Sequence, residues 1–247
     1  MIISISGKAG SGKDTVGKII QYLENPKATN ESIAKAIKSE NRSFKGSSWQ
    51  IKKYSDKLKD IVCILIGCTR EQLEDQEFKE TPLGKEWDYR MVFDANWEKQ
   101  WTPQRPSFGG DMPIKQRTPR QILQLLGTEG TRDVIHPDIW VNALYSEYNP
   151  MSYEKDSEGR IETVEEKWII TDSRFPNDVR RTREMGGALV RVNRAECEGR
   201  ENEHFSETAL DDFDEWDHVI ENNGTIEELI EQVRTILEEE GIIEEKE

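Results

Sequence analysis

A glycine-rich turn that ends in a lysine, Gly7–Lys13, carries the strongest chemical signal in this sequence. It matches the pattern G-x-x-x-x-G-K, in which glycines allow backbone N–H groups to point at phosphate oxygens. A short β-prone run, residues 2–6, precedes the turn, and a helical pattern from Lys13 to about Leu23 follows it. The helix start adds partial positive charge, and the lysine can reach the β and γ phosphates of a nucleoside triphosphate. The pattern predicts a phosphate-binding loop, with a Gly/Ser turn and a chance lysine as the alternative.

The residue after this lysine departs from the usual pattern. Asp14 stands where Ser or Thr is expected, and Thr15 follows it. The first hydroxyl after the lysine is therefore not present to bind a metal directly. Adenylate-kinase-type enzymes show a similar shift of one residue, so we expect Thr15 on the Mg²⁺ side of the phosphates.

A second predicted strand also ends in charged residues. The predicted strand 167–171 has an apolar centre at 168–170 and leads into Asp172 and Arg174. In open α/β sheets, ligands bind at the carboxyl ends of the strands. Asp172 could order Mg²⁺ or its waters, and Arg174 could bridge donor and acceptor phosphates. The alternative is an ordinary strand-to-helix turn in which Asp172 is a local cap.

A phosphorylated acceptor would place a particular demand on such a site. Its attacking oxygen is already anionic, so the obstacle is repulsion between two polyanions rather than the lack of a base. Several cationic side chains, Mg²⁺ and closure against water would meet that demand. The three histidines need not be catalytic. The candidate cations are Lys13, Arg120, Arg174, Arg194 and Arg200, followed by Lys57 and Lys59.

The rest of the pattern alternates strands with helices, which predicts an α/β fold with a parallel sheet covered on both faces. Thr118 and Gln121 form a capping box at one helix start, and we expect Asn177 to cap another helix. Between these elements we expect a solvated insertion at 25–48, a loop, lid or interface at 84–116, and a hairpin or loop at 149–166. The expected strands are 2–6, 49–54, 167–171, 188–193 and 218–221, and the expected helices are 13–23, 58–67 and 119–126, with others from about 137, 177 and 225.

Composition disfavours several classes of function. The 247 residues carry a net charge of -15, whereas a duplex-binding surface needs clustered Lys and Arg. The three cysteines have no disulfide or metal spacing, which suits a reducing compartment. No apolar run approaches the roughly 20 residues that span a bilayer, and Met1 opens directly into a strand. We therefore expect a cytoplasmic protein without a nucleic-acid or membrane partner, and with a homodimer as one option.

Several short blocks of this sequence occur together in one known family. The blocks are residues 11–15, 55–59, 120–128, 139–141, 171–174, 177–178, 204–207 and 217–224. In their order and spacing the chain resembles the deoxynucleotide monophosphate kinase family known from bacteriophages, and more distantly animal-type phosphomevalonate kinase. The resemblance implies a single P-loop kinase domain over 1–247, with a parallel five-stranded sheet, a helical acceptor-binding region at about 55–145, inserted loops and a lid at about 194–210. It also implies that ATP and a deoxynucleoside monophosphate react, with Mg²⁺, to give ADP and a deoxynucleoside diphosphate.

The resemblance implies roles for individual residues as well. Trp140 would stack on the acceptor base, although a Trp on the apolar side of a helix is often a core residue. Asn222 and Gly224 would meet the adenine of ATP, unless they form a plain Asn-Gly turn. The implied ATP-binding residues are Gly7, Gly10, Ser11, Gly12, Lys13, Asp14, Thr15, Asn222 and Gly224. The implied acceptor-binding residues are Asp14, Lys59, Arg120, Trp140, Arg174 and Asp178, and the implied lid residues are Arg194, Arg200 and His204. The implied catalytic residues are Lys13, Asp172 and Arg174, and the implied metal ligands are Thr15 and Asp172.

Two other functions fit the same motifs. A P-loop kinase could act on a different phosphorylated metabolite such as phosphomevalonate, but base stacking by Trp140 favours a nucleotide. A nucleotide-dependent switch could use the Trp-rich stretch 84–116 as its partner surface. The combination of Asp172, Arg174 and Arg120 argues for phosphate transfer instead.

Overall fold

The computed structural model describes residues 1–39, 46–93, 99–102, 114–155, 160–197, 199 and 205–244. The chain divides into two compact units. The first, which we call the sheet unit, comprises Met1–Tyr54 and Val141–Glu247. The second, the helical unit, is Ser55–Trp140 and lies within the predicted acceptor-binding region 55–145.

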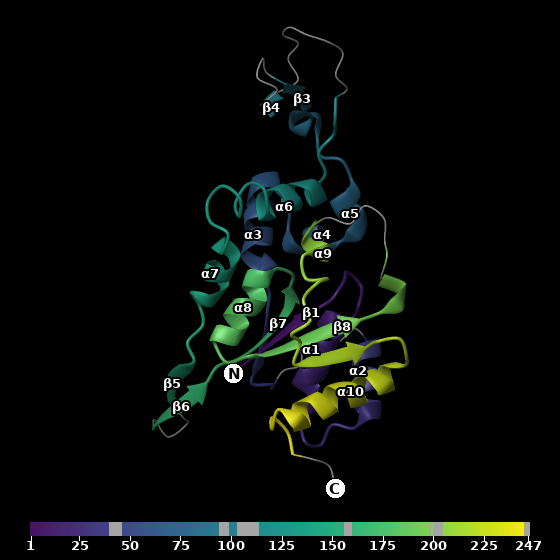
Figure 1. The fold of residues 1–247 in the computed structure, drawn as a ribbon, viewed down its shortest axis with the longest axis vertical. Coiled ribbons are helices and arrows are strands. Elements are labelled where there is room, and N and C mark those ends of the chain that lie inside the picture. Colours follow the sequence, from purple (N-terminus) through teal and green to yellow (C-terminus); the bar gives the residue numbers. More distant parts are fainter. Residues whose placement is uncertain are drawn as a thin grey trace. The chain divides into compact units, whose positions relative to one another are not determined.

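A five-stranded parallel sheet forms the centre of the sheet unit (Figure 1). Its strands, in spatial order, are β2 (Trp49–Lys52), β7 (Lys167–Ser173), β1 (Ile2–Ser6), β8 (Ala188–Asn193) and β9 (His218–Glu221). All four pairings are parallel. Every residue of β1 is buried, as expected for the central strand of a sheet covered on both faces. The predicted α/β fold with a parallel five-stranded sheet is confirmed.

Helices cover both faces of this sheet (Figure 1). They are α1 (Lys13–Leu23), α2 (Asn30–Lys38), α8 (Pro176–Glu184) and α10 (Ile226–Glu239). The helices α1, α2 and α10 share one buried cluster with β1, in which Ile3 meets residues such as Ile19 and Ile230. Helix α8 packs on β1 and β8, and its Val179 lies in a separate cluster with Leu189. Burial of these apolar faces is the main favourable term in holding the layers together.

Helix α2 corrects one expectation from the sequence. The segment 25–48 was predicted to be a solvated insertion, but residues 30–38 form a helix with a capping box between Thr29 and Ser32. Its Ile33 and Ala34 are buried against the main cluster. The helix was missed because its apolar side consists of few residues within a polar stretch.

Two further expectations concern the sheet unit. The stretch 149–166 contains an antiparallel hairpin, β5 (Met151–Lys155) with β6 (Ile161–Glu165), as one of the two predicted alternatives. The prediction that Asn177 caps α8 is wrong, because Phe175 holds the N-cap position and Pro176 begins the helix. Proline at a first helical position is favoured, since its missing N–H would have no helical partner there.

The helical unit contains short helices and a second small hairpin. Its elements are α3 (Ser55–Ile66), α4 (Arg70–Glu74), α5 (Gln76–Glu80), the 3₁₀ turn η1 (Lys85–Trp87), the paired strands β3 (Arg90–Phe93) and β4 (Lys99–Thr102), α6 (Pro119–Gly127) and the start of α7 (Ile139–Tyr145). The predicted capping box of Thr118 with Gln121 is present at α6. Trp97 and residues 103–113, in the Trp-rich stretch, lie outside the described residues. Among the helices that the structure describes, none is long and apolar enough to cross a bilayer.

Candidate functional site

The glycine-rich turn after β1 has the backbone of a phosphate-binding loop. Gly7 and Gly12 have φ angles of 153° and 102°, a region that side chains rarely allow. A Cβ atom on Gly12 would lie 2.5 Å from Nδ2 of Asn222, and one on Gly7 would collide with the carbonyl oxygen of Val192. Glycine is therefore needed at both positions by backbone angle and by space. The turn leads directly into α1, so the N-terminal N–H groups of that helix face the loop region.

Lys13 lies across the inside of this loop. Its Nζ atom donates hydrogen bonds of 2.6 Å and 2.7 Å to the carbonyl oxygens of Gly7 and Lys8. Burial, followed by the charge of Arg174, lowers the pKa of Lys13 from 10.5 to about 8. Asp14 and Asp172 act in the opposite direction, raising it. The charges of both Asp172 and Arg174, at the carboxyl end of β7, thus act on this lysine.

Asp14, the unusual residue of the motif, is tied to two neighbouring strands. Its Oδ1 atom accepts a 2.6 Å hydrogen bond from the hydroxyl of Thr171 and lies 2.7 Å from Nζ of Lys53. Burial alone would raise the pKa of Asp14, but the contacts with Lys53 and Thr171 outweigh it and lower the pKa. Lys53 follows the end of β2 and was not among the predicted cations. The predicted strand 49–54 placed Lys53 inside the strand, so no signal in the sequence marked it as a residue of the site.

Asp172 and Arg174 occupy the carboxyl edge of the sheet beside the loop. Oδ1 of Asp172 accepts a 2.8 Å hydrogen bond from the backbone N–H of Tyr54. Arg174 forms an ion pair with Glu207, whose other oxygen accepts a 3.0 Å hydrogen bond from the N–H of Ala9 in the loop. The phosphate loop, Asp172 and Arg174 are therefore brought together at one sheet edge. Glu207, which contacts both the loop and Arg174, lies in the predicted lid region 194–210, and no contact with either partner was predicted for it.

Asp178 has contacts that bear on how Arg174 is held. Its side chain is buried, and Oδ2 accepts hydrogen bonds of 3.0 Å from the backbone N–H groups of both Arg174 and Phe175. These bonds satisfy backbone donors at the start of α8, where a helix leaves such groups without helical partners. The family resemblance implied that Asp178 lies in the acceptor site, and its hydrogen bonds hold the backbone of Arg174, another candidate residue.

The loop after β9 touches the phosphate loop directly. Nδ2 of Asn222 donates a 2.8 Å hydrogen bond to the carbonyl oxygen of Ser11, and Oδ1 of Asn223 accepts a 2.8 Å bond from the N–H of Ala195. Gly224 follows and leads into the capping box of α10. Of the two predicted adenine-binding residues, Asn222 thus contacts the loop that would hold the phosphates, and Gly224 lies two residues further along the chain.

The predicted lid is only partly described. Arg194 forms a 2.7 Å ion pair with Glu196, whereas Arg200 and His204 lie outside the described residues. The short helix α9 (Phe205–Thr208) begins directly after that gap.

The predicted acceptor residues Lys59 and Arg120 lie in the helical unit, where acidic or amide side chains meet them. Lys59 is 2.7 Å from Glu74, while Arg120 pairs with Glu80 and donates a 2.8 Å hydrogen bond to Gln76. Lys79, which the sequence did not single out, belongs to the same group. Burial, then the charge of Arg120, lowers the pKa of Lys79, with Lys59 contributing in the same direction.

Trp140 is almost fully enclosed within the helical unit. Its side chain is 5% exposed, and its indole N–H donates a 2.9 Å hydrogen bond to the carbonyl oxygen of Gly127. A buried indole normally has such a partner. This arrangement matches the core packing that the sequence analysis kept as the alternative to base stacking.

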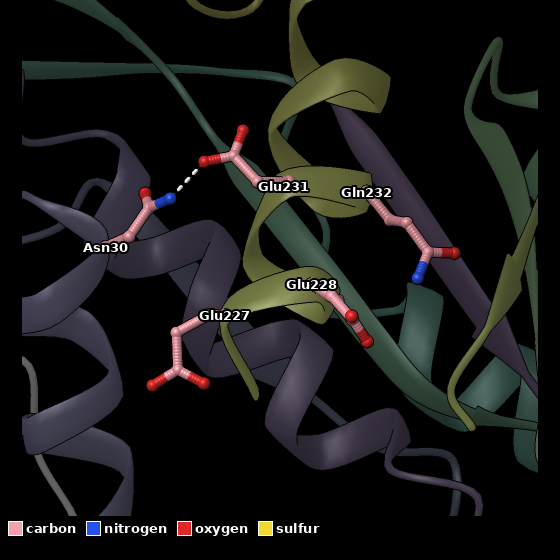
Figure 2. Close-up of a pocket in the computed structure, with 5 residues that line it drawn as sticks. All are labelled: Asn30, Glu227, Glu228, Glu231 and Gln232. Atoms are coloured by element: carbon pink, nitrogen blue, oxygen red, sulfur yellow. Dashed lines mark hydrogen bonds between the residues drawn. The ribbon is translucent and has the colours of Figure 1, made fainter. Parts of the chain in front are cut away.

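A hollow elsewhere on the sheet unit does not coincide with this edge (Figure 2). It has a volume of about 550 Å³, and Figure 2 shows Asn30 bonded to Glu231 at its rim. Three glutamates of α10 line it, and their charges would repel phosphate groups. The candidate site for phosphate chemistry is therefore the carboxyl edge of the sheet, not this hollow.

Together the fold and the glycine-rich turn are those of a P-loop α/β protein. A family model described as deoxynucleotide monophosphate kinase matches residues 113–233, just under half of the chain. The phosphate loop lies outside that match, so the loop geometry and the match are separate pieces of evidence. The predicted resemblance to the deoxynucleotide monophosphate kinase family is confirmed.

Individual relatives agree with this family. The chain is 26% identical over 240 residues to the deoxynucleoside-5'-monophosphate kinase of Escherichia phage T5, and the match covers 85% of each protein. It is 29% identical over 118 residues to the deoxynucleotide monophosphate kinase of Escherichia phage RB69, which covers 48% of this chain and 44% of that protein. A protein of Acanthamoeba polyphaga mimivirus that carries the same name provisionally is 29% identical over 123 residues, 47% of this chain and 59% of its own length. The chain thus spans about half the length of two of these three relatives.

Proposed function

We propose that this chain transfers the γ-phosphate of ATP to a deoxynucleoside monophosphate, giving ADP and a deoxynucleoside diphosphate. The observation that carries the proposal is that the phosphate loop lies at the same sheet edge as Asp172 and Arg174, the two charged residues at the carboxyl end of β7. The charges of Asp172 and Arg174 both act on the pKa of Lys13, Arg174 lowering it and Asp172 raising it. The names of the phage relatives support the choice of acceptor.

Phosphate transfer between two anionic substrates requires mainly that their negative charge be neutralised. An oxygen of the acceptor phosphate attacks the γ-phosphorus, the bond to the β–γ bridging oxygen breaks, and ADP leaves with that oxygen. Since the attacking oxygen is already anionic, no general base is required. Lys13 and Arg174 would hold the transferred group and offset the charge that spreads over its oxygens.

The residues at the edge also fit Mg²⁺. This ion takes few ligands from the protein and the remainder from phosphates and water, and prefers oxygen. Asp172 supplies one carboxylate beside the loop, and Thr15 supplies a hydroxyl in the first turn of α1. When bound, the ion would reduce the negative charge of the β and γ phosphates; among the described residues no cluster of three acidic, His or Cys ligands is present.

For the acceptor, the proposal keeps the residues that the family resemblance implies. Lys59 and Arg120 would hold its phosphate, Trp140 its base, and Asp14 and Asp178 would act at the site directly or by positioning neighbours. Loop residues Gly10 and Ser11 would bind ATP with the other residues of the turn, and Asn222 and Gly224 would meet its adenine. The phage origin of the relatives supports a place for this reaction in the cytoplasm of an infected host.

The test is an assay of ADP release in the presence of Mg²⁺ and ATP, with each of the four common deoxynucleoside monophosphates as acceptor. Release that depends on at least one of them, together with formation of its diphosphate, is the expected result. Phosphomevalonate serves as the control acceptor and should give no release above the rate with ATP alone. Slow release with ATP that no acceptor accelerates would contradict the proposal.

A further inference from the structure

The carboxylate of Glu207 contacts two groups that the proposed function assigns to phosphate. One oxygen accepts the 3.0 Å hydrogen bond from the N–H of Ala9, inside the phosphate loop. The other forms the ion pair with Arg174. A single carboxylate therefore links the loop that would hold the donor to the arginine that would meet the group being transferred.

A carboxylate and a phosphate compete for the same donors. Both are anionic oxygen acceptors, and both form strong, charge-assisted bonds with backbone N–H groups and with guanidinium groups. The terminal phosphate of ATP is the group that must lie between the loop and Arg174 if transfer is to occur. Glu207 thus bonds to donors that this phosphate requires.

The backbone that carries Glu207 is anchored independently of its carboxylate. Nζ of Lys8, which is 4% exposed, lies 2.7 Å from Oδ2 of Asp211 and donates a 3.0 Å hydrogen bond to the carbonyl oxygen of Glu207. Arg191 lies 3.5 Å from the other oxygen of Asp211. The side chain of Glu207 can therefore leave its partners by rotation while the segment remains attached to the loop.

The ion pair itself is open enough to exchange. The side chain of Arg174 is 32% exposed and that of Glu207 is 17% exposed. Solvent weakens ion pairs at such positions, so a better anion can replace one partner. A triphosphate with Mg²⁺ also gains the remaining donors of the loop, which the carboxylate does not reach.

We propose that the Glu207 carboxylate occupies the place of the donor's terminal phosphate, and that ATP exchanges with it on Ala9 and Arg174. This inference rests on the proposed function. ATP must displace Glu207 before it binds fully, whereas ADP, which lacks the terminal phosphate, need not. Glu207 therefore lowers the affinity for ATP relative to ADP.

Titration calorimetry with Mg²⁺-ATP and with Mg²⁺-ADP tests the exchange. Glu207→Gln removes the charge at constant size, and we expect its ATP dissociation constant to fall about 3- to 10-fold, with a change below about twofold for ADP. Asp212→Asn is the matched control, because Asp212 is an exposed acid in the same segment, and it should leave both constants unchanged. A residue with only a structural role would weaken ATP binding when replaced, so the sign of the change is decisive.

Two further measurements keep the inference testable if Glu207→Gln folds poorly. Glu207→Asp keeps the charge but shortens its reach, and should tighten ATP binding by a smaller factor. A crystal structure of the unchanged chain with a non-hydrolysable ATP analogue should have Glu207 released from the N–H of Ala9. Glu207 still bonded to Ala9 in that complex, or ATP and ADP affected equally by Glu207→Gln, would overturn the exchange while leaving the kinase proposal standing. Failure of the unchanged chain to bind either nucleotide would overturn both.

Discussion

The sheet edge and the helical unit hold their candidate residues in different ways. At the sheet edge, the phosphate loop, Asp172 and Arg174 come from neighbouring strand ends, and the charges of Asp172 and Arg174 shift the pKa of Lys13. In the helical unit, Lys59 and Arg120 lie on different helices, and each is paired with an acidic side chain of α4 or α5. Both regions contain ion pairs, since Arg174 pairs with Glu207 and Lys53 with Asp14, but the cations of the sheet edge lie around a loop whereas those of the helical unit lie on separate helices.

The difference follows from the architecture of each region. The carboxyl ends of parallel strands meet at one edge, so any residues placed after them converge. Residues on short helices converge only if side-chain packing orients the helices appropriately. A motif at the sheet edge can therefore be interpreted from the sequence alone, while a helical binding region needs its tertiary contacts.

The largest expected effect tests the sheet edge. Lys13→Met should reduce turnover by at least about a hundredfold, because the cation that follows the transferred charge is lost. Its hydrogen bonds go only to loop carbonyls in the described contacts, so the circular dichroism spectrum should be unchanged. Near-normal ADP release by a folded Lys13→Met variant would show that the sheet edge is not the site of phosphate transfer.

The next effect distinguishes packing from binding at Trp140. Trp140→Ala should lower the free energy of unfolding by about 3–5 kcal/mol, because it leaves a cavity in the helical unit. Trp140→Phe keeps a ring and loses the bond to Gly127, which should cost only about 1 kcal/mol in denaturant unfolding.

Kinetics on the same two variants address the base. We expect Trp140→Ala to raise the KM of the acceptor more than the KM of ATP, and Trp140→Phe to leave both near their original values. An equal rise of both constants would restrict Trp140 to packing.

A smaller effect is expected from the paired cations of the helical unit. Arg120→Ala should raise the KM of the acceptor about tenfold with the KM of ATP unchanged, since a charge-assisted bond to phosphate is lost. Arg117→Ala is the matched control, because Arg117 lies three residues earlier and its guanidinium is 3.9 Å from the Tyr89 ring centre. If both variants behave alike, the ion pair of Arg120 with Glu80 is only structural.

The smallest expected effect is the pH dependence of ATP affinity that follows from the pKa of Lys13 at the sheet edge. The pKa of Lys13 is lowered to about 8, so the cation is present below that pH and is lost as the pH rises through it. The affinity for ATP should therefore decrease above about pH 8, by at most about tenfold per pH unit. Lys13→Arg stays charged over this range, and its affinity should be flat between pH 7 and 9. A parallel decline in both proteins would assign the pH dependence to another group.

Predictions from the sequence succeeded where a pattern is local and strong. The strands Ala188–Asn193 and His218–Glu221 have the predicted bounds, and the capping box at Thr118 is present. Helix α2 was missed because its burial depends on contacts with α1 and α10, which no local period reveals. Lys53 was missed for a similar reason, since its partner Asp14 is distant in the sequence and only the sheet brings them together.

By itself, the sequence determined the phosphate loop, the strands on either side of it and the parallel sheet, because glycine angles and apolar runs act over a few residues. Only the tertiary structure decided which partner each polar side chain contacts: Glu207 contacts Ala9 and Arg174, Asp178 the backbone of Arg174, and Trp140 the carbonyl of Gly127. Such pairings join residues that are distant in the chain or lie in separate elements. They depend on how elements pack, and an amino-acid pattern without coordinates does not contain those distances.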